Sequence, residues 1–319
     1  MLSSWAKSTQ DSYNVYLKKW VKYCEGKNLN PYNCEFGKAM QFLVELYKQG
    51  AKYGYIAAAR SALSAVLSQA EGKTFGEDPR VSRFLKGVFR LRPQLPKYTE
   101  IYDPNVILNY MRSMPENTNL LLEHLVKKLA TLICLLSGQR GQTMPKLRLD
   151  CMSKSSDAYT FFIPTALKQT KPGHHQEPLR FEAFPDEKKL CVVHVLDEYL
   201  QRTELIREQL EGNPQDLFLS YAYPHKPIGK AALTRYIKLF VLDAGIDVTV
   251  YSNHSLRKAS TSKANNIGLA ISDIQKAVGW KSKDVFRKHY KLPIKDNLGS
   301  RLLENNGCLL YTSPSPRDS

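Results

Sequence analysis

The stretch from Asn119 to Arg140, NLLLEHLVKKLATLICLLSGQR, predicts a long helix that is apolar enough to lie inside a domain. Gly138 is expected to end this helix, because glycine readily adopts the conformation that follows a last helical turn. Arg140 then lies where the chain turns. A guanidinium held there can bind two oxygens of one phosphate, and an arginine that caps the helix carbonyls is the alternative interpretation.

The residues before this helix predict a domain boundary. The segment PQLPKYTEIYDP, from Pro93 to Pro104, contains three prolines and no helical period, which is typical of a linker. A chain of 319 residues also exceeds the ordinary size of a single core. We therefore expect a helical domain at residues 1–95, a linker at 96–104 and a second domain at 105–300. The remaining residues, 301–319, are expected to be a disordered or non-native tail.

The first domain is predicted to be a small bundle, because apolar residues recur at helical spacing in four short segments. The third helix is expected to span Tyr55 to Ala70, and the fourth to run up to Pro93. The first and fourth helices carry cations that we assign to DNA binding: Lys18, Lys19, Lys22, Arg83, Lys86 and Arg90. A basic face that is merely solvated is the alternative interpretation.

The second domain is predicted to be mainly helical with a small antiparallel sheet. Tyr159–Ile163 and Leu179–Phe184 favour two strands joined by a polar loop, and Leu217–Ser220 favours a further short strand. Besides the long helix, the periodicity predicts helices from about Asp103 and over residues 192–209, 230–244, 255–265, 271–278 and 282–290. The fold class expected for the whole chain is therefore mainly α, with two domains.

The charge of the chain indicates a polyanionic partner. There are 46 Lys and Arg residues against 30 Asp and Glu, which gives a net charge of +16. Such a field attracts nucleic acid, and a soluble protein kept monomeric by its charge is the alternative. The six cysteines show no CxxC spacing, so neither zinc nor a disulfide framework is indicated. No stretch has the length of a membrane span, and we expect an intracellular protein with no membrane partner.

Two later segments contain side chains suited to phosphate chemistry. In NHSLRKASTSKANNIG, His254 and Arg257 are three residues apart and share one face of a helix. This spacing also arises often by chance. In AVGWKSKDVFRKHYKLP, Trp280 precedes Tyr290, which lies among basic residues that favour the approach of a phosphate. Tyrosine is among the side chains that form covalent intermediates.

The polar loop between the two strands supplies lysines, in the segment TALKQTKPGHHQEP. Lys168 or Lys171 could deliver a proton, because neighbouring cations lower the pKa of a lysine, and solvated surface lysines are the alternative. Together, these segments supply the side chains suited to metal-free transesterification at a phosphodiester: two arginines, a histidine, a lysine, an indole and a phenol. Fixed cations stabilise the charge that builds up on the phosphate oxygens in its transition state.

The order Arg, Lys, HxxR, Trp and Tyr resembles that of the tyrosine recombinases, the phage integrase family. The segments SWAKSTQDSYNVYLKKW, ARSALSAV, HSLRKASTSKA and GWKSKDVFRKHYKLPI are more narrowly similar to recombinases of DIRS-like and Ngaro-like retroelements and Cryptons. This resemblance implies that Tyr290 attacks the phosphate while Arg140 and Arg257 clamp its oxygens. It implies that His254 and Trp280 complete the anion site. We favour Lys168 over Lys171 as the general acid.

The same resemblance implies a SAM-like core-binding domain and a catalytic domain that clamp double-stranded DNA from opposite sides. It further implies a homotetramer on two DNA sites, no cofactor, no metal, and work in a nucleus on behalf of a mobile element. Two alternatives share the family's features. One is a DNA-binding descendant that no longer cuts, and the other is a relaxase, similar to type IB topoisomerases, that acts alone.

Overall fold

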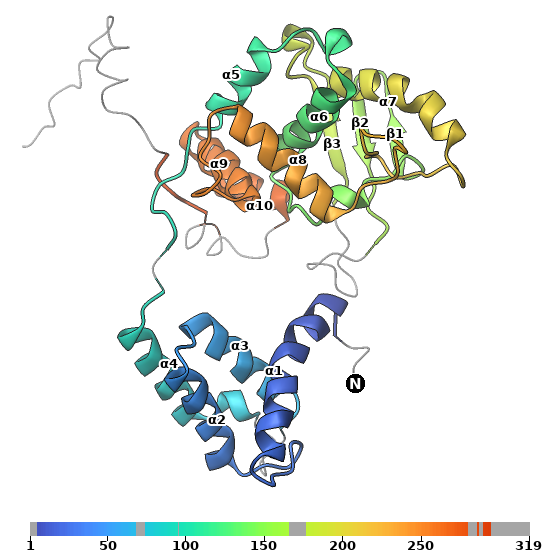
Figure 1. The fold of residues 1–319 in the computed structure, drawn as a ribbon. Helices are drawn as coiled ribbons and strands as arrows, with labels where there is room; N and C mark the ends of the chain where they lie inside the picture. The colour runs from blue at the N-terminus through green and yellow to red at the C-terminus, as the bar shows by residue number, and fades with distance from the viewer. Residues whose placement is uncertain are drawn as a thin grey trace, which may run out of the picture. The chain divides into compact units, whose positions relative to one another are not determined.

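In the computed structural model, the chain divides into two units between Pro96 and Lys97 (Figure 1). The structure describes residues 5–67, 74–94, 96–165, 177–279, 286 and 290–294. Among these residues, no helix is long and apolar enough to cross a membrane.

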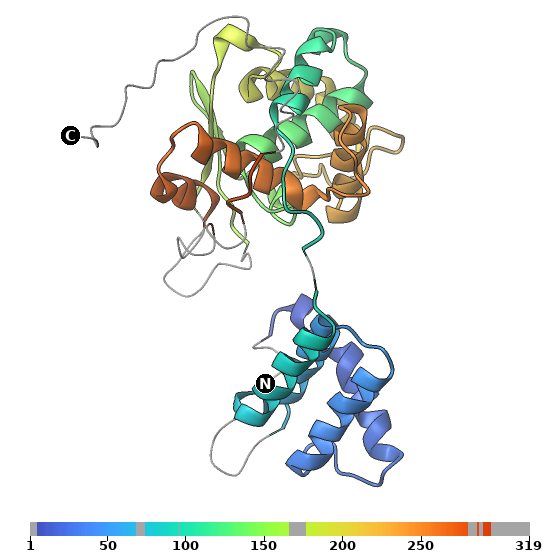
Figure 2. The same ribbon diagram turned by 90° about the vertical axis from the view of Figure 1, so that its left-hand side faces the viewer.

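The first unit is a bundle of four helices, α1 (Lys7–Glu25), α2 (Phe36–Lys48), α3 (Tyr53–Ser64) and α4 (Pro79–Leu91). Helix α3 contacts each of the other three, and Figures 1 and 2 show them gathered around a common centre. The core holds apolar side chains from all four helices, and Trp20 is fully buried in it. The indole N–H of Trp20 donates to the carbonyl of Pro31 at 2.8 Å, so its polar atom is satisfied inside the core.

Helix α4 has a well-defined start, because Asp78 accepts a hydrogen bond from the backbone N–H of Arg80 at 2.8 Å and Pro79 takes the first helical position. Its apolar face is buried at Val81, Leu85 and Val88, which are spaced at helical intervals. The opposite face is exposed and basic. The expected end of the third helix at Ala70 is wrong, since α3 ends at Ser64 and the chain leaves the helix in a turn at Ala65 and Val66.

The second unit is built around α6 (Leu122–Ser137), which is almost entirely buried. It contacts α7 (Val192–Gln209), α8 (Lys230–Asp243) and α9 (Asn253–Asn266). In Figure 1, α9 and α10 (Ile271–Val278) lie on one side of α6 and the yellow α7 on the other. Helix α5 is formed by Asn105–Ser113.

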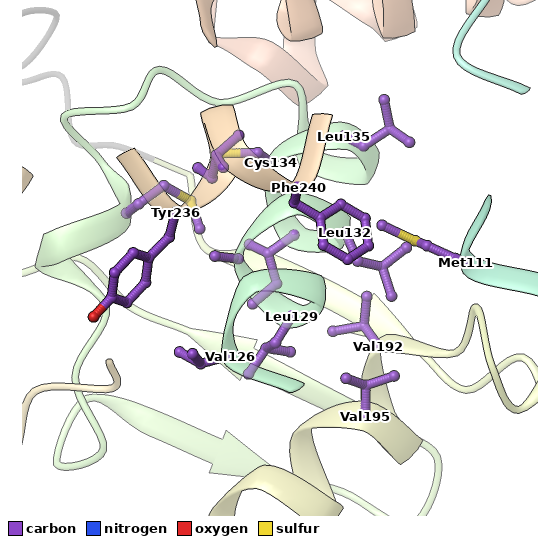
Figure 3. Close-up of a cluster of buried hydrophobic side chains, with 14 of the residues drawn as sticks. Met111, Val126, Leu129, Leu132, Cys134, Leu135, Val192, Val195, Tyr236 and Phe240 are labelled. Atoms are coloured by element: carbon purple, nitrogen blue, oxygen red, sulfur yellow. The ribbon is translucent and has the colours of Figure 1, made fainter. Parts of the chain in front are cut away.

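Apolar side chains converge on α6 from several elements, as Figure 3 shows. Val126, Leu129 and Leu132 come from α6 itself, while Met111 belongs to α5 and Phe240 to α8. All of these side chains are buried in one cluster. Because the core surrounds α6, the end of this helix is fixed in space, and so is the turn that follows it.

A small antiparallel sheet packs beside α7. Its strands are β1 (Met152–Lys154), β2 (Ala158–Phe161) and β3 (Leu179–Glu182), in the order β1-β2-β3. Tyr159 pairs with Phe181 in this register, and β3 contacts α7. The predicted mainly α fold with a small antiparallel sheet is thus confirmed.

One predicted strand is wrong. Leu217–Ser220 forms no ladder, although the side chains of Leu217, Phe218 and Leu219 are buried. Its backbone groups are used by separate loops instead, with the N–H of Leu217 donating to Leu147 at 2.9 Å and the N–H of Ser220 donating to Lys226 at 2.9 Å. Isolated bridges of this kind satisfy buried backbone groups without adding a strand to a sheet.

Candidate active site

Helix α9 carries two of the predicted site residues on one face. Its first turn is fixed by a capping box, in which Ser252 and Ser255 exchange hydrogen bonds between side chain and backbone. His254 lies in that first turn and Arg257 one turn later. Ser255 and Arg257 are both buried, so this part of the helix has no freedom to rotate.

The structure brings Tyr290 to this face from 36 residues further along the chain. The phenol oxygen of Tyr290 lies 3.1 Å from Nε2 of His254, and the two rings meet edge to face. The guanidinium carbon of Arg257 lies 5.5 Å from the centre of the Tyr290 ring. Tyr290 is only 6% exposed and packs with Ile274, Val278 and Phe286. Its hydroxyl is therefore held beside the histidine and arginine of its own chain.

Arg257 is a buried cation with another cation near it. The residue is 2% exposed, and its Nη2 donates to the carbonyl of Val278, at the end of α10, at 3.1 Å. Burial, and then the positive charge of Arg140, lower the pKa of Arg257 to about 10. Burial and the neighbouring positive charge both disfavour the charged form of Arg257. A bound anion near the two arginines would stabilise that charged form.

His254 lies in the same positive field. Although the residue as a whole is exposed, loss of water around its ring is the largest cause of a pKa that is lowered to about 4. The charges of Arg257 and Lys258, and then of Arg140, act in the same direction. A histidine with this pKa is neutral near pH 7, and a neutral imidazole can accept a proton.

Arg140 is placed by the end of α6. The helix closes on Gly138, which has a φ of +57°, and the Nε2 of Gln139 donates to the carbonyl of Ala277 at 3.3 Å. The backbone carbonyl of Arg140 accepts from the N–H of Thr143 at 2.8 Å. The turn is thus tied to α10 on one side and to its own next turn on the other, and Arg140 itself is partly exposed.

The backbone after Tyr290 is attached at two points. The hydroxyl of Ser262, on α9, donates to the Tyr290 carbonyl at 2.5 Å and accepts from the N–H of Leu292 at 3.3 Å. The N–H of Ile101 donates to the carbonyl of Pro293 at 2.9 Å. Sequence reasoning missed Ser262, because nothing in ASTSKA separates it from its neighbours Ser260 and Thr261.

The other predicted residues do not contribute to this site as the structure describes it. Lys168, Lys171 and Trp280 lie outside the described residues. The predicted DNA-binding residues are all exposed on α1 and α4: Lys18, Lys19, Lys22, Arg83, Lys86 and Arg90. The described residues contain no cluster of three or more His, Cys, Asp or Glu able to hold a metal ion.

The sequence of residues 108–293, more than half of the chain, matches the family model described as "Phage integrase family". The chain belongs to the phage integrase family. This region includes α6, α9 and α10, and it contains Arg140, His254, Arg257 and Tyr290. The family-level resemblance inferred from the sequence is thereby confirmed. A search of curated proteins found no match.

Several solved structures have a fold similar to that of this chain. A post-cleavage complex of the XerH site-specific recombinase with palindromic difH substrate gives a TM-score of 0.57 at 15% identity, covering 87% of this chain and 74% of that one. The pre-cleavage XerH complex with difH gives 0.52 at 15% identity, covering 79% and 66%, just under two thirds of that chain. The Tn1549 transposon integrase in complex with transposon right end DNA gives 0.51 at 14%, covering 85% and 84%. At such identities the likeness concerns the fold.

Proposed function

We propose that this member of the phage integrase family is a site-specific DNA recombinase that breaks and rejoins double-stranded DNA through a covalent bond to Tyr290. The observation that carries the proposal is the 3.1 Å contact between the Tyr290 hydroxyl and Nε2 of His254, with Arg257 against the same phenol ring. A nucleophile hydrogen-bonded to a neutral base, beside fixed cations, is the arrangement that nucleophilic catalysis needs.

In the proposed step, the phenol oxygen of Tyr290 attacks the phosphorus of one DNA strand and its proton passes to Nε2 of His254. The bond from phosphorus to the 5′ oxygen breaks, and the phosphate at the 3′ end remains joined to Tyr290. The leaving 5′ oxygen takes up a proton, for which we propose Lys168 as the donor and Lys171 as the alternative. Rejoining reverses the step, because the energy of the broken bond is kept in the tyrosyl ester.

Arg140 and Arg257 have the proposed role of holding the non-bridging oxygens. The charges of Arg257 and Arg140 both lower the pKa of His254, and the charge of Arg140 also lowers the pKa of Arg257. Charge develops on those oxygens in the transition state, so cations placed beforehand lower its energy. We propose that Trp280 completes this anion site.

The proposal extends to the DNA and to assembly. We propose that the first unit is a core-binding domain whose exposed cations on α1 and α4 contact DNA phosphates, and that residues 105–300 form the catalytic domain. The Tn1549 neighbour is described as a complex with DNA and the XerH neighbours as site-specific recombinases bound to difH substrate, which supports a DNA partner. We further propose a mobile-element origin close to DIRS-like, Ngaro-like or Crypton recombinases, action in a nucleus, and a homotetramer on two sites.

The decisive experiment is capture of the covalent intermediate. Binding sites are first selected from a pool of random-sequence duplexes with the Tyr290→Phe protein, and the selected duplexes are then nicked next to each candidate cleavage position. Wild-type protein is expected to form a DNA adduct that survives detergent, and peptide mass spectrometry should place it on Tyr290. Tyr290→Phe should bind the duplex without forming the adduct.

Three outcomes contradict the proposal. An adduct that persists in Tyr290→Phe assigns the nucleophile to another residue. Salt-sensitive binding with no adduct from the wild-type protein favours the alternative, a DNA-binding descendant that no longer cuts. Relaxation of supercoiled plasmid by a monomer, without strand exchange, instead favours the topoisomerase-like relaxase.

A further inference from the structure

A buried hydroxyl attaches the main chain of Tyr290 to α9. Ser262 is 1% exposed, and its Oγ donates to the Tyr290 carbonyl at 2.5 Å while accepting from the N–H of Leu292 at 3.3 Å. The N–H of Leu292 also donates to the Tyr290 carbonyl at 2.9 Å, which closes a tight turn directly after the nucleophile. The Ser262 hydroxyl therefore holds both polar groups of that turn.

We propose that Ser262 is a positioning residue that sets where the Tyr290 hydroxyl lies relative to His254, an inference that rests on the nucleophilic role proposed for Tyr290. His254 and Ser262 belong to the same helix and are eight residues apart, which corresponds to a rise of about 12 Å along the axis. His254 contacts the hydroxyl end of the tyrosine, and Ser262 contacts its carbonyl. Helix α9 thus holds the nucleophile at both ends.

A directional contact at the main-chain end complements the hydrogen bond of the hydroxyl to His254, because the ring between these two ends is packed mostly against apolar side chains. Tyr290 lies with Ile274, Val278 and Phe286 in a small cluster. Apolar packing keeps the ring buried but has no preferred direction, whereas a hydrogen bond depends on both distance and angle. The Ser262 bond therefore fixes the position of the turn along α9, and the position of the hydroxyl follows from it.

The downstream tether does not replace this contact. The Ile101 N–H donates to Pro293, three residues beyond Tyr290, and Ile101 also bridges Ile294. This attachment holds the chain segment that follows Tyr290, and it joins that segment to the residues before α5. The Ser262 hydroxyl, in contrast, links the Tyr290 carbonyl to the helix that carries His254.

The test compares Ser262→Ala with Ser262→Thr and with Ser260→Ala in the full-length protein. Ser260 is the matched control, since it is a partly buried serine on the same helix whose hydroxyl donates to the Arg257 carbonyl at 3.2 Å. Single-turnover cleavage is measured on the nicked duplex at saturating protein, together with DNA affinity. Amide hydrogen exchange of peptides covering residues 290–294 is measured without DNA.

We expect Ser262→Ala to cleave about 10- to 100-fold more slowly, because small displacements of a reacting group cost rates of this size. Its DNA affinity should stay unchanged, and exchange at Leu292 should accelerate. Ser262→Thr keeps a hydroxyl and should restore most of the rate, which a loss due to general unfolding would not predict. Ser260→Ala should match the wild type in all three measurements.

Several results overturn the inference. If Ser262→Ala cleaves at the wild-type rate, Ser262 has no positioning role. The same conclusion follows if Ser262→Ala cleaves slowly but amide hydrogen exchange at residues 290–294 is unchanged. A Ser262→Thr variant that folds but stays as slow as Ser262→Ala also contradicts it. Absence of any adduct from the wild-type protein refutes the function proposed for Tyr290, and the exchange data then decide separately whether Ser262 holds the turn.

Discussion

Arg257 carries a charge that destabilises the free protein, because the residue is buried, and that the proposed reaction requires. A buried guanidinium beside a second arginine is costly in the free protein, and its pKa is lowered for that reason. The cost is offset when a phosphate occupies the space between the two cations. In the proposed reaction the stabilisation is largest in the transition state, where the phosphate oxygens carry the most charge.

Replacing Arg257 by alanine is therefore expected to slow single-turnover cleavage by at least about 100-fold, because the variant has no donor at this position for the developing charge. Arg257→Lys should recover little, since an ammonium cannot donate two parallel hydrogen bonds to one phosphate. The measurement is the rate of adduct formation at saturating protein. Lys276→Ala, which removes an exposed cation from α10, is the control. Equal rates for Arg257→Ala and the control would refute the clamp.

The lowered pKa of His254 predicts how the stability of the protein depends on pH. Its pKa in the folded protein lies below the ordinary 6.5, so the unfolded chain binds the proton more readily between about pH 4 and 6.5. Stability should fall as pH decreases through this window. His254→Gln has no proton to gain and should lose less stability over the same range. Urea unfolding at several pH values tests this, with His194→Gln on α7 as the control, and an identical pH slope for His254→Gln and wild type would contradict it.

At the scale of the elements, the turn that ends α6 connects the core to the site. A Cβ added to Gly138 would lie 2.7 Å from Cγ1 of Val278, and the glycine has a φ of +57°. Gly138→Ala should therefore destabilise the protein by at least about 2 kcal/mol, from backbone strain together with overpacking against α10. The control is Gly141→Ala, because a Cβ there meets nothing within 4 Å. The midpoint of urea unfolding is measured for both variants. Equal midpoints would contradict the prediction, because they would show that α10 shifts to accept the added methyl group with no loss of stability.

Helices with strong apolar periodicity could be predicted from the sequence, and the weaker elements could not. The predicted bounds of α7 and α10 agree with the structure, since each has a continuous buried face. The strand β1 was missed because three residues, Met152 to Lys154, are too short for a pattern. Leu217–Ser220 has a strand-like composition, but its hydrogen bonds go to separate loops, which depends on tertiary contacts.

The candidate site also contains some features that the sequence predicts and others that it does not. His254 and Arg257 share a helix face, which their spacing predicts. The contact with Tyr290 joins residues that are 36 positions apart, and it was expected from family resemblance and not from any local pattern. The carbonyl of Val278 and the hydroxyl of Ser262 were missed, since backbone partners and single serines leave no signal in one sequence.

At the scale of the whole molecule, positive charge is the property that bears on the partner. The net charge is +16, and exposed cations of the first unit lie on α1 and α4. Each phosphate that the protein neutralises releases counterions, so the logarithm of the DNA affinity should fall linearly with the logarithm of the salt concentration. The slope reports how many phosphates are neutralised.

Combined replacement of Arg83, Lys86 and Arg90 by alanine should reduce that slope by about 3, roughly one for each phosphate that the variant no longer neutralises. Lys27→Ala is the control, because Lys27 is paired with Glu45 at 3.2 Å. Fluorescence anisotropy on a fixed duplex at a series of salt concentrations gives both slopes. If the triple variant keeps the wild-type slope, α4 does not contact the DNA backbone.

The hydrogen bond from Ile101 to Pro293 joins the beginning of the second unit to the end of its described part. An isolated catalytic fragment that starts after Ile101 would lose this hydrogen bond and, with it, the attachment of the chain segment that follows Tyr290. The same proximity means that the two ends could be fused by a short peptide and new termini opened elsewhere. In a circular permutant opened between α9 and α10, Tyr290 would be translated before His254, and it should still fold against the same histidine.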